Sequence, residues 1–327
     1  MADYINIYGQ DILAVASDPA NPTVGQIWYN TTSNTLKGLG VSSVGSWATA
    51  NPLNTARQYL AGTGTQTAGL AFGGRNPPSP PSGSTEEYDG ISWTNSNNLN
   101  TARLGLRGAG IQTSALAFGG SSPPFTTATE EYDGTSWTSV NSMNTARGFM
   151  SGVGIQTAAL AFGGNLGGPP LFSATEEYDG TSWVNSNPMN TARSALAGAG
   201  TQTAAVGFGG DDSVVTAATE EYDGNSWTNV NSMNTARGAL AGAGLQTAAI
   251  GFGGETPSAT GATEEYDGNS WTSSPASLAT ARVWLAGAGT QTTGLAFGGN
   301  LGTGVIVGTT EEWNGAGSPQ TKTITVS

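Results

Sequence analysis

The charged side chains of this chain recur at regular positions, and three kinds of chemistry could use them. Six of its eight arginines each follow a small-residue step and lie 44 to 46 residues apart: Arg57, Arg103, Arg147, Arg193, Arg237 and Arg282. Every repeat also holds two adjacent glutamates, such as Glu130 and Glu131. Free arginines in a ring would bind an anionic group, two carboxyl groups of different pKa would hydrolyse a glycosidic bond, and arginines paired with carboxylates would be structural.

The pattern favours the structural interpretation. Because side chains alternate along a strand, Glu130 and Tyr132 share one face while Glu131 points the other way. A buried glutamate needs a partner, so we expect six bidentate arginine–carboxylate contacts, with the anion-binding ring as the alternative. The same environment recurs six times, which argues against a catalytic pair. We therefore predict no catalytic residue and no asymmetric cluster of carboxylates with perturbed pKa values in the central channel.

Composition narrows the functions further. The chain has no Cys and no His, which removes thiolate metal sites and the commonest metal ligand and general base. One Asp in each Tyr-Asp-Gly turn is too few for calcium. We predict no metal, no cofactor and no enzyme. The formal charge of −13 disfavours nucleic acid and anionic membranes as partners. Neither an export signal nor a membrane span is expected, because no apolar run of about 18 residues occurs.

The elements that hold these residues form a repeat of about 45 residues. From each arginine, two short runs of small and apolar residues lead through a polar turn to Phe-Gly-Gly, as at Phe118, which predicts a hairpin of strands a and b. Small residues in strand a suit an innermost strand near an axis. Thr-Glu-Glu-Tyr is then strand c, Asp-Gly a hairpin turn and Ser-Trp the start of strand d. Each repeat is a four-stranded meander, here called a blade.

This order of Gly-Gly, Tyr, Trp and Arg resembles the kelch repeat and covers roughly residues 45 to 315. The resemblance implies an all-β, six-bladed kelch-type β-propeller of four-stranded antiparallel blades, with a c–d turn shorter than the family norm. Strand d of the last blade is expected from around Trp47, because the final repeat lacks Ser-Trp. Thr321 to Ser327 would add an edge strand. A seventh blade made from residues 26–50 and the C-terminal tail is the alternative. The expected domains are residues 1–44 and a propeller of residues 45–327.

The N-terminal extension carries a predicted hairpin with strands near Ile27–Asn30 and Thr35–Lys37. It resembles the N-terminal stretches of bacteriophage virion and tail-fibre proteins, in which Gly-x-Ile-Trp-Tyr-Asn-Thr-Thr followed by Thr-Leu-Lys recurs. The resemblance implies a non-enzymatic virion component, as a tail fibre, tail tip or capsid decoration, located on the virion. Its partners would be other virion proteins or a host surface receptor or glycan, with self-assembly through the extension.

The b–c loops are the only strongly variable part of the repeat, and six dissimilar loops on one face of a rigid scaffold are typical of recognition. Candidate ligand contacts are the arginine ring and the apolar loop residues Phe125, Leu171, Phe172, Val214, Val215 and Val305. A carbohydrate-binding propeller of the lectin type is the alternative function. For that alternative the candidate stacking residues are Trp28 and Trp284, which lie outside the repeated Trp positions.

Overall fold

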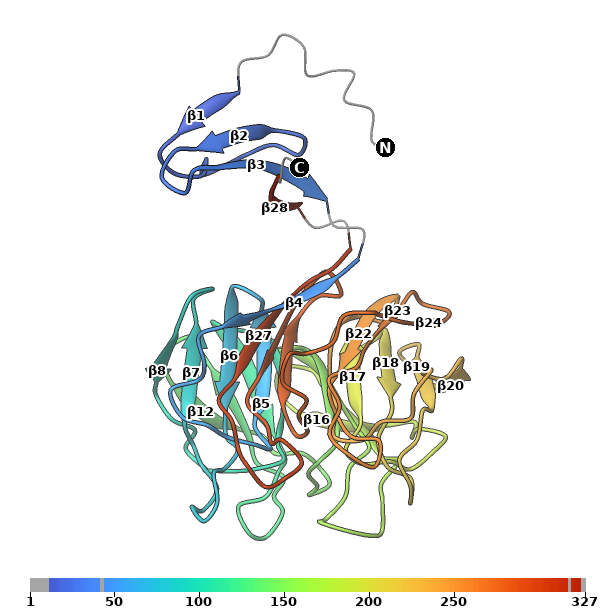
Figure 1. Ribbon diagram of the computed structural model, residues 1–327. Coiled ribbons are helices and arrows are strands. Elements are labelled where there is room, and N and C mark those ends of the chain that lie inside the picture. The colour runs from blue at the N-terminus through green and yellow to red at the C-terminus, as the bar shows by residue number, and fades with distance from the viewer. Residues whose placement is uncertain (1–11, 42–43, 317–318, 325–327) are drawn as a thin grey trace. The chain divides into compact units, whose positions relative to one another are not determined.

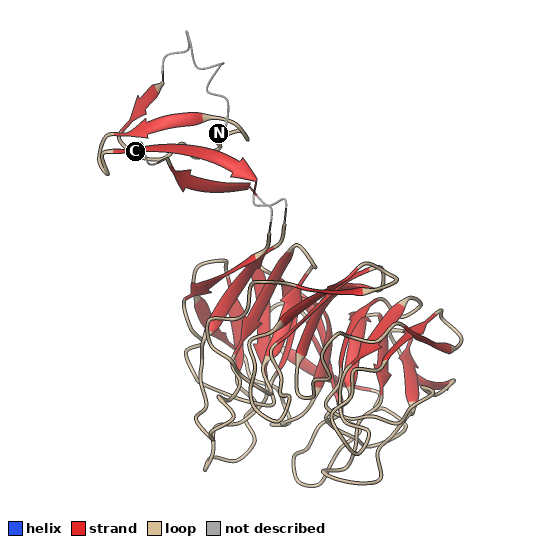
Figure 2. Ribbon diagram, turned by 45° about the vertical axis from the view of Figure 1, so that its right-hand side comes forward, coloured by secondary structure: helices blue, strands red, loops and turns tan. Residues whose placement is uncertain are grey.

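The computed structural model describes residues 12–41, 44–316 and 319–324, and they form two compact units. Residues 46–314 make up the larger unit, and the flanking segments at both ends of the chain make up the smaller one. Strands and loops account for the described residues (Figures 1 and 2). Within them there is no helix long and apolar enough to cross a membrane.

The larger unit consists of six four-stranded antiparallel sheets, one for each sequence repeat. In blade 2, strands a to d are β9 (Arg107–Ile111), β10 (Ser114–Phe118), β11 (Thr129–Tyr132) and β12 (Trp137–Val140). The other blades are β5 (Ala61–Thr65), β6 (Ala68–Phe72), β7 (Thr85–Tyr88) and β8 (Trp93–Ser96); β13 (Ser151–Ile155), β14 (Ala158–Phe162), β15 (Thr175–Tyr178) and β16 (Trp183–Ser186); β17 (Ala197–Gly200), β18 (Ala205–Phe208), β19 (Thr219–Tyr222) and β20 (Trp227–Val230); β21 (Ala241–Leu245), β22 (Ala248–Phe252), β23 (Thr263–Tyr266) and β24 (Trp271–Ser273); and β25 (Ala286–Gly289), β26 (Thr293–Phe297), β27 (Thr310–Asn314) and β4 (Ser46–Ala50).

The innermost strands contact one another in a closed cycle, β5, β9, β13, β17, β21, β25 and back to β5. Their glycines are required by this close approach, since a Cβ on Gly62 would lie 2.3 Å from the Phe297 ring of the preceding blade. The apolar cores lie between blades: Phe72 of blade 1, for example, packs with Tyr132 and Trp137 of blade 2. The prediction that small residues mark strand a is confirmed.

Ring closure follows the expected exchange of strands between the chain ends. β4 pairs with β27, with Trp47 opposite Trp313, so Trp47 takes the place of the missing Ser-Trp of blade 6. The indole N–H of Trp47 donates to the Thr263 hydroxyl of blade 5 at 2.9 Å. The equivalent bond from Trp93 to Thr310 carries the same contact from blade 1 to blade 6. The ring therefore has six blades.

The smaller unit is one mixed sheet in the order β1 (Leu13–Val15), β2 (Ile27–Asn30), β3 (Thr35–Val41) and β28 (Pro319–Thr323). The predicted hairpin is present, with its second strand extending to Val41. The expected placement of the C-terminal tail on the ring is wrong, because β28 pairs with β3 instead. The place beside β27 is occupied by β4, so the tail does not supply that strand. The propeller range of 45–327 thus ran too far, and residues 325–327 of the expected edge strand lie outside the described residues.

Asp18 organises this sheet. Its carboxylate accepts hydrogen bonds from Lys37 Nζ at 2.7 Å, Asn30 Nδ2 at 2.7 Å and the indole N–H of the fully buried Trp28 at 3.0 Å. These donors, Lys37 first, lower the pKa of Asp18 to about 2. Asn30 also accepts the backbone N–H of Ser33 in the β2–β3 turn. The Trp-Tyr-Asn string is thus the core and turn of a small folded sheet.

Candidate functional site

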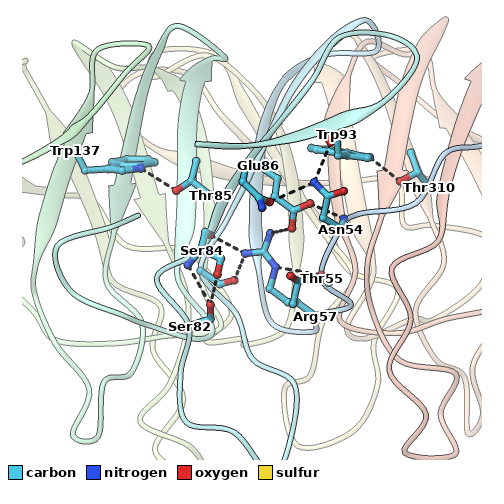
Figure 3. A network of polar contacts seen from close by, with 12 residues as sticks. Asn54, Thr55, Arg57, Ser82, Ser84, Thr85, Glu86, Trp93, Trp137 and Thr310 are labelled. Carbon is cyan, nitrogen blue, oxygen red and sulfur yellow. Dashed lines mark hydrogen bonds and ion pairs between the residues drawn. The ribbon is translucent and has the colours of Figure 1, made fainter. Parts of the chain in front are cut away.

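The six repeat arginines lie inside the ring and are paired. Each is buried and forms an ion pair with the first glutamate of strand c in its own repeat. In blade 1, Arg57 Nη2 donates to Glu86 Oε1 at 2.8 Å, and Arg57 Nη1 donates to the carbonyls of Gly73 and Ser84 (Figure 3). Burial lowers the pKa of Arg57 and the glutamate opposes that shift.

The contact is an ion pair but not the expected bidentate fork. The second carboxylate oxygen of Glu86 accepts the backbone N–H of Asn54 at 2.6 Å, from the connection that enters the blade (Figure 3). Each glutamate therefore joins strand c to the d–a connection as well as to its arginine. The alternative that Arg57 and its five equivalents form an anion-binding ring is wrong, because a ligand would have to displace a buried carboxylate.

The second glutamate of each pair is structural too. In five blade interfaces it accepts the Tyr hydroxyl of the next blade, as Glu131 does from Tyr178 at 2.9 Å. Burial and this acceptor raise the pKa of Tyr132 and Tyr222 to about 12. The sixth interface lacks the contact because Trp313 replaces the tyrosine. Glu265, which would face it, has its pKa raised by burial.

A contact that the sequence analysis missed comes from the glutamine of the a–b turn. Gln112 Nε2 donates to the backbone carbonyls of Gly69 at 3.0 Å and Tyr88 at 2.7 Å, both in the preceding blade. The same pair of bonds recurs at all six interfaces. The Gln-Thr string in every repeat was the available signal. These repeated polar side chains thus form contacts within the ring itself. We therefore look for a binding site among the residues that vary between repeats.

At the b–c loop end, the axis is closed by a cyclic backbone hydrogen-bond network. The six residues that precede strand a each donate their N–H to the equivalent carbonyl of an adjacent blade: Tyr59, Gly105, Phe149, Ala195, Ala239 and Trp284. All six have left-handed backbone conformations, with φ from 52° to 64°. Three of them are aromatic and mutually packed, with ring centroids 4.9 to 5.5 Å apart: Tyr59, Phe149 and Trp284. We call these three residues the axial aromatic cluster.

Around this cluster, the first residue of each b–c loop differs from blade to blade: Arg75, Ser121, Asn165, Asp211, Glu255 and Asn300. The guanidinium of Arg75 lies 5.6 Å from the centre of the Tyr59 ring. Burial raises the pKa of both Asp211 and Glu255, and Asp211 adds to the shift at Glu255. These two carboxylates lie at the first position of the b–c loops and not in the central channel, for which no asymmetric carboxylate cluster is predicted.

A groove lies beside Asp211, between the b–c loops of blades 3 and 4. It has a volume of about 680 Å³ and is lined by Pro169, Leu171, Ala192, Asp211, Asp212, Ser213, Val214 and Val215. This volume falls in the range of small-molecule sites. Apolar side chains form most of its wall, Val214 is 68% exposed, and two carboxylates lie at its edge.

The predicted contact residues of the loops differ in how exposed they are. Val305 is 54% exposed, as expected for a contact residue. Phe125 is half-buried and packs against Phe149 at a centroid distance of 6.1 Å, so it supports the axial aromatic cluster. Phe172 is also half-buried. Of the two Trp candidates for sugar stacking, Trp28 is buried in the smaller unit and Trp284 is half-buried in the cluster. Of the expected contact residues, Leu171, Val214 and Val215 line the groove, whereas Asp211 and Asp212 were not among the candidates.

No group of three or more metal-ligating side chains occurs among the described residues. No protein-family model matches the chain, and no curated protein matches it. Among solved structures, one entitled "Structure of YjhT" aligns with a TM-score of 0.66 at 12% sequence identity, over 79% of this chain and 95% of that chain. At this identity the likeness concerns the fold alone. Together with the ring of blades, it defines the chain as an all-β protein of the β-propeller class.

Proposed function

We propose that this chain is a non-enzymatic binding propeller of the kelch type that serves as a bacteriophage virion component. In this proposal, the b–c loop face recognises a host surface receptor or glycan, and the small terminal sheet attaches the ring to other virion proteins. The particle would be its location, as a tail fibre, tail tip or capsid decoration. No cofactor enters the proposed function.

The observation that carries the proposal is the groove between the loops of blades 3 and 4. This groove lies on the b–c loop face and has a volume of about 680 Å³. Most of its lining residues belong to the variable loops and not to the repeated strands. An apolar wall with Asp211 and Asp212 at its edge suits a ligand that combines an apolar surface with hydrogen-bond donors or positive charge. The scaffold beneath it is held by buried ion pairs, so the loops are displayed on a rigid base.

The attachment role rests on how the chain leaves the ring. Ser46 and Asn314 are cross-strand partners in blade 6, at the edge that carries the c–d turns. Both ends of the chain therefore leave the ring side by side, from the side opposite the b–c loops. They then contribute to one sheet, β1-β2-β3-β28.

Size-exclusion chromatography with light scattering tests the attachment role. The full chain is compared with residues 46–314, because removing residues 1–44 alone would leave β28 without the strand it pairs with. We expect the full chain to form a defined oligomer and the ring alone to be a folded monomer. A monomeric full chain would count against self-assembly through the terminal sheet.

A glycan array and a binding assay on bacterial cells test the recognition role. Val214→Lys places a charge in the groove, and Ile91→Lys is its matched control, since Ile91 is 71% exposed on a c–d turn. Binding should be lost with the first variant and kept with the second. Equal binding by both would remove the groove from the proposal.

A carbohydrate-binding propeller is the second candidate function. The carboxylates of Asp211 and Glu255 favour this function, because they can accept hydrogen bonds from sugar hydroxyl groups. The aromatic side chains beside them are Tyr59 and Trp284. Against it, no Trp is fully exposed among the described residues. The oligomeric state of the full chain separates the two candidates, because a lectin-type propeller binds glycans without assembling through the terminal sheet.

A further inference from the structure

One position in strand a breaks the sixfold repetition at the axis. The residues that line the central channel at this level are Ala61, Arg107, Ser151, Ala197, Ala241 and Ala286. Four of the six blades carry alanine there. Alanine is therefore sufficient for ring packing, and the arginine and serine of two adjacent blades are additions that the scaffold does not require.

Arg107 lacks the partner that every repeat arginine has. Its guanidinium Nη1 donates to the carbonyl of the neighbouring Leu106 at 3.0 Å, and no ion pair to it occurs among the described residues. Burial lowers its pKa to about 10, with no carboxylate opposing the shift. Arg107 is only partly buried, on the wall of the axial channel, and a guanidinium without a counter-charge in a narrow channel attracts an anion.

Ser151 supplies a second polar group at the same level. It is buried in the strand next to that of Arg107, and Arg107 Cβ lies 3.1 Å from where a Cβ on Gly152 would be. Its hydroxyl has no hydrogen bond to another described residue. Arg107 and Ser151 both line one cavity of about 60 Å³, and both side chains carry hydrogen-bond donors.

The channel is blind and narrow. Arg107 also lines the space beneath the axial aromatic cluster, and this cluster closes the b–c loop end. The other half of the channel, of about 120 Å³, is lined by the glycines and small residues of the six inner strands and leads toward the a–b turns. A cavity of this size holds a small ion with one or two waters, but not a sugar or a nucleotide.

We propose that the axial channel binds one small inorganic anion, of the size of chloride, between the Arg107 guanidinium and the Ser151 hydroxyl. The anion enters from the a–b turn end, since the aromatic cluster blocks the other. It neutralises the one arginine on the channel wall, which has no carboxylate partner among the described residues. This site is independent of the loop face and of the proposed function.

Bromide is the crystallographic probe, because it replaces chloride and scatters anomalously. Crystals of the full chain soaked in sodium bromide should show an anomalous peak on the axis beside Arg107, and crystals of Arg107→Ala should lack it. The variant restores the alanine of four other blades, so it is expected to fold. An axis without bromide in the wild-type crystal overturns the proposal without reference to any variant.

Thermal unfolding gives the solution readout. Chloride replaces gluconate at constant ionic strength, since gluconate is larger than the cavity. The melting temperature of the wild type should rise by about 2–4 °C at a chloride concentration roughly ten times the Kd. Arg107→Ala should show no rise, Ser151→Ala a smaller one, and the matched control Arg75→Ala the full rise. The same chloride dependence in wild type and Arg107→Ala overturns the proposal.

Discussion

Replacing Glu220 by glutamine should lower the free energy of unfolding of this protein more than any substitution on its surface. Arg193 donates to Glu220 Oε1 at 2.9 Å and to the carbonyls of Gly209 at 2.9 Å and Ala218 at 2.6 Å. The other oxygen of Glu220 accepts the N–H of Asn190 at 2.7 Å. Both members of the ion pair are buried. Glutamine keeps one acceptor but leaves the guanidinium charge without its counter-charge.

Breaking a buried ion pair by removing one partner costs about 3–5 kcal/mol. We expect Glu220→Gln at the lower end, about 3 kcal/mol, because the amide oxygen can still accept a hydrogen bond. Arg193→Met should cost about 4 kcal/mol, since it removes the donor to two carbonyls as well. The double variant should cost less than the sum, by about 2–3 kcal/mol, because no uncompensated charge remains.

Urea unfolding at pH 7, followed by Trp fluorescence, measures these free energies. Glu255→Gln is the control, since the pKa of Glu255 is raised by burial and no arginine pairs with it. That change should leave stability unchanged or slightly higher. A cost below about 1 kcal/mol for Glu220→Gln, or strict additivity in the double variant, would refute the view that these pairs hold the scaffold.

Three further predictions concern the interfaces between blades. Tyr178→Phe removes the hydroxyl that donates to Glu131 at 2.9 Å and should cost about 1–2 kcal/mol in urea unfolding. Glu265→Gln should stabilise the ring at pH 7, because a raised folded-state pKa penalises the ionised form; this gain should vanish as the pH falls below the unfolded-state value, and a constant gain between pH 4 and 7 would contradict it. Trp47→Phe loses the indole hydrogen bond that closes the ring and should cost about 2 kcal/mol, with hydrogen exchange accelerated first in β4 and β27; unchanged exchange there would argue against closure by this strand.

The repeat made most of the ring predictable. Thr-Glu-Glu-Tyr became strand c, Asp-Gly the c–d turn and Ser-Trp strand d in blade after blade, because period-two alternation and turn chemistry are local properties. The missing Ser-Trp in the last repeat correctly indicated Trp47 as its substitute. The pairing of the arginines with strand c was also predictable, since a buried carboxylate requires a partner.

Three features could not be read from the repeat. The tail strand β28 pairs with β3 and not with a strand of the ring. No local sequence pattern predicts such a long-range pairing. The second oxygen of Glu86 went to a backbone N–H, because a donor on the d–a connection lay within reach once the blades had stacked. The groove beside Val214 depends on the conformations of two irregular loops.

The sequence alone determined the blade: which residues form each strand and which side chains face the neighbouring sheet. These follow from spacing and from the need to bury each repeated apolar face against the next. Only the tertiary structure decided what lies on the axis. Arg107, Ser151, Tyr59, Phe149 and Trp284 come from four different blades and meet there because the ring closes, and closure is a property of all six repeats together.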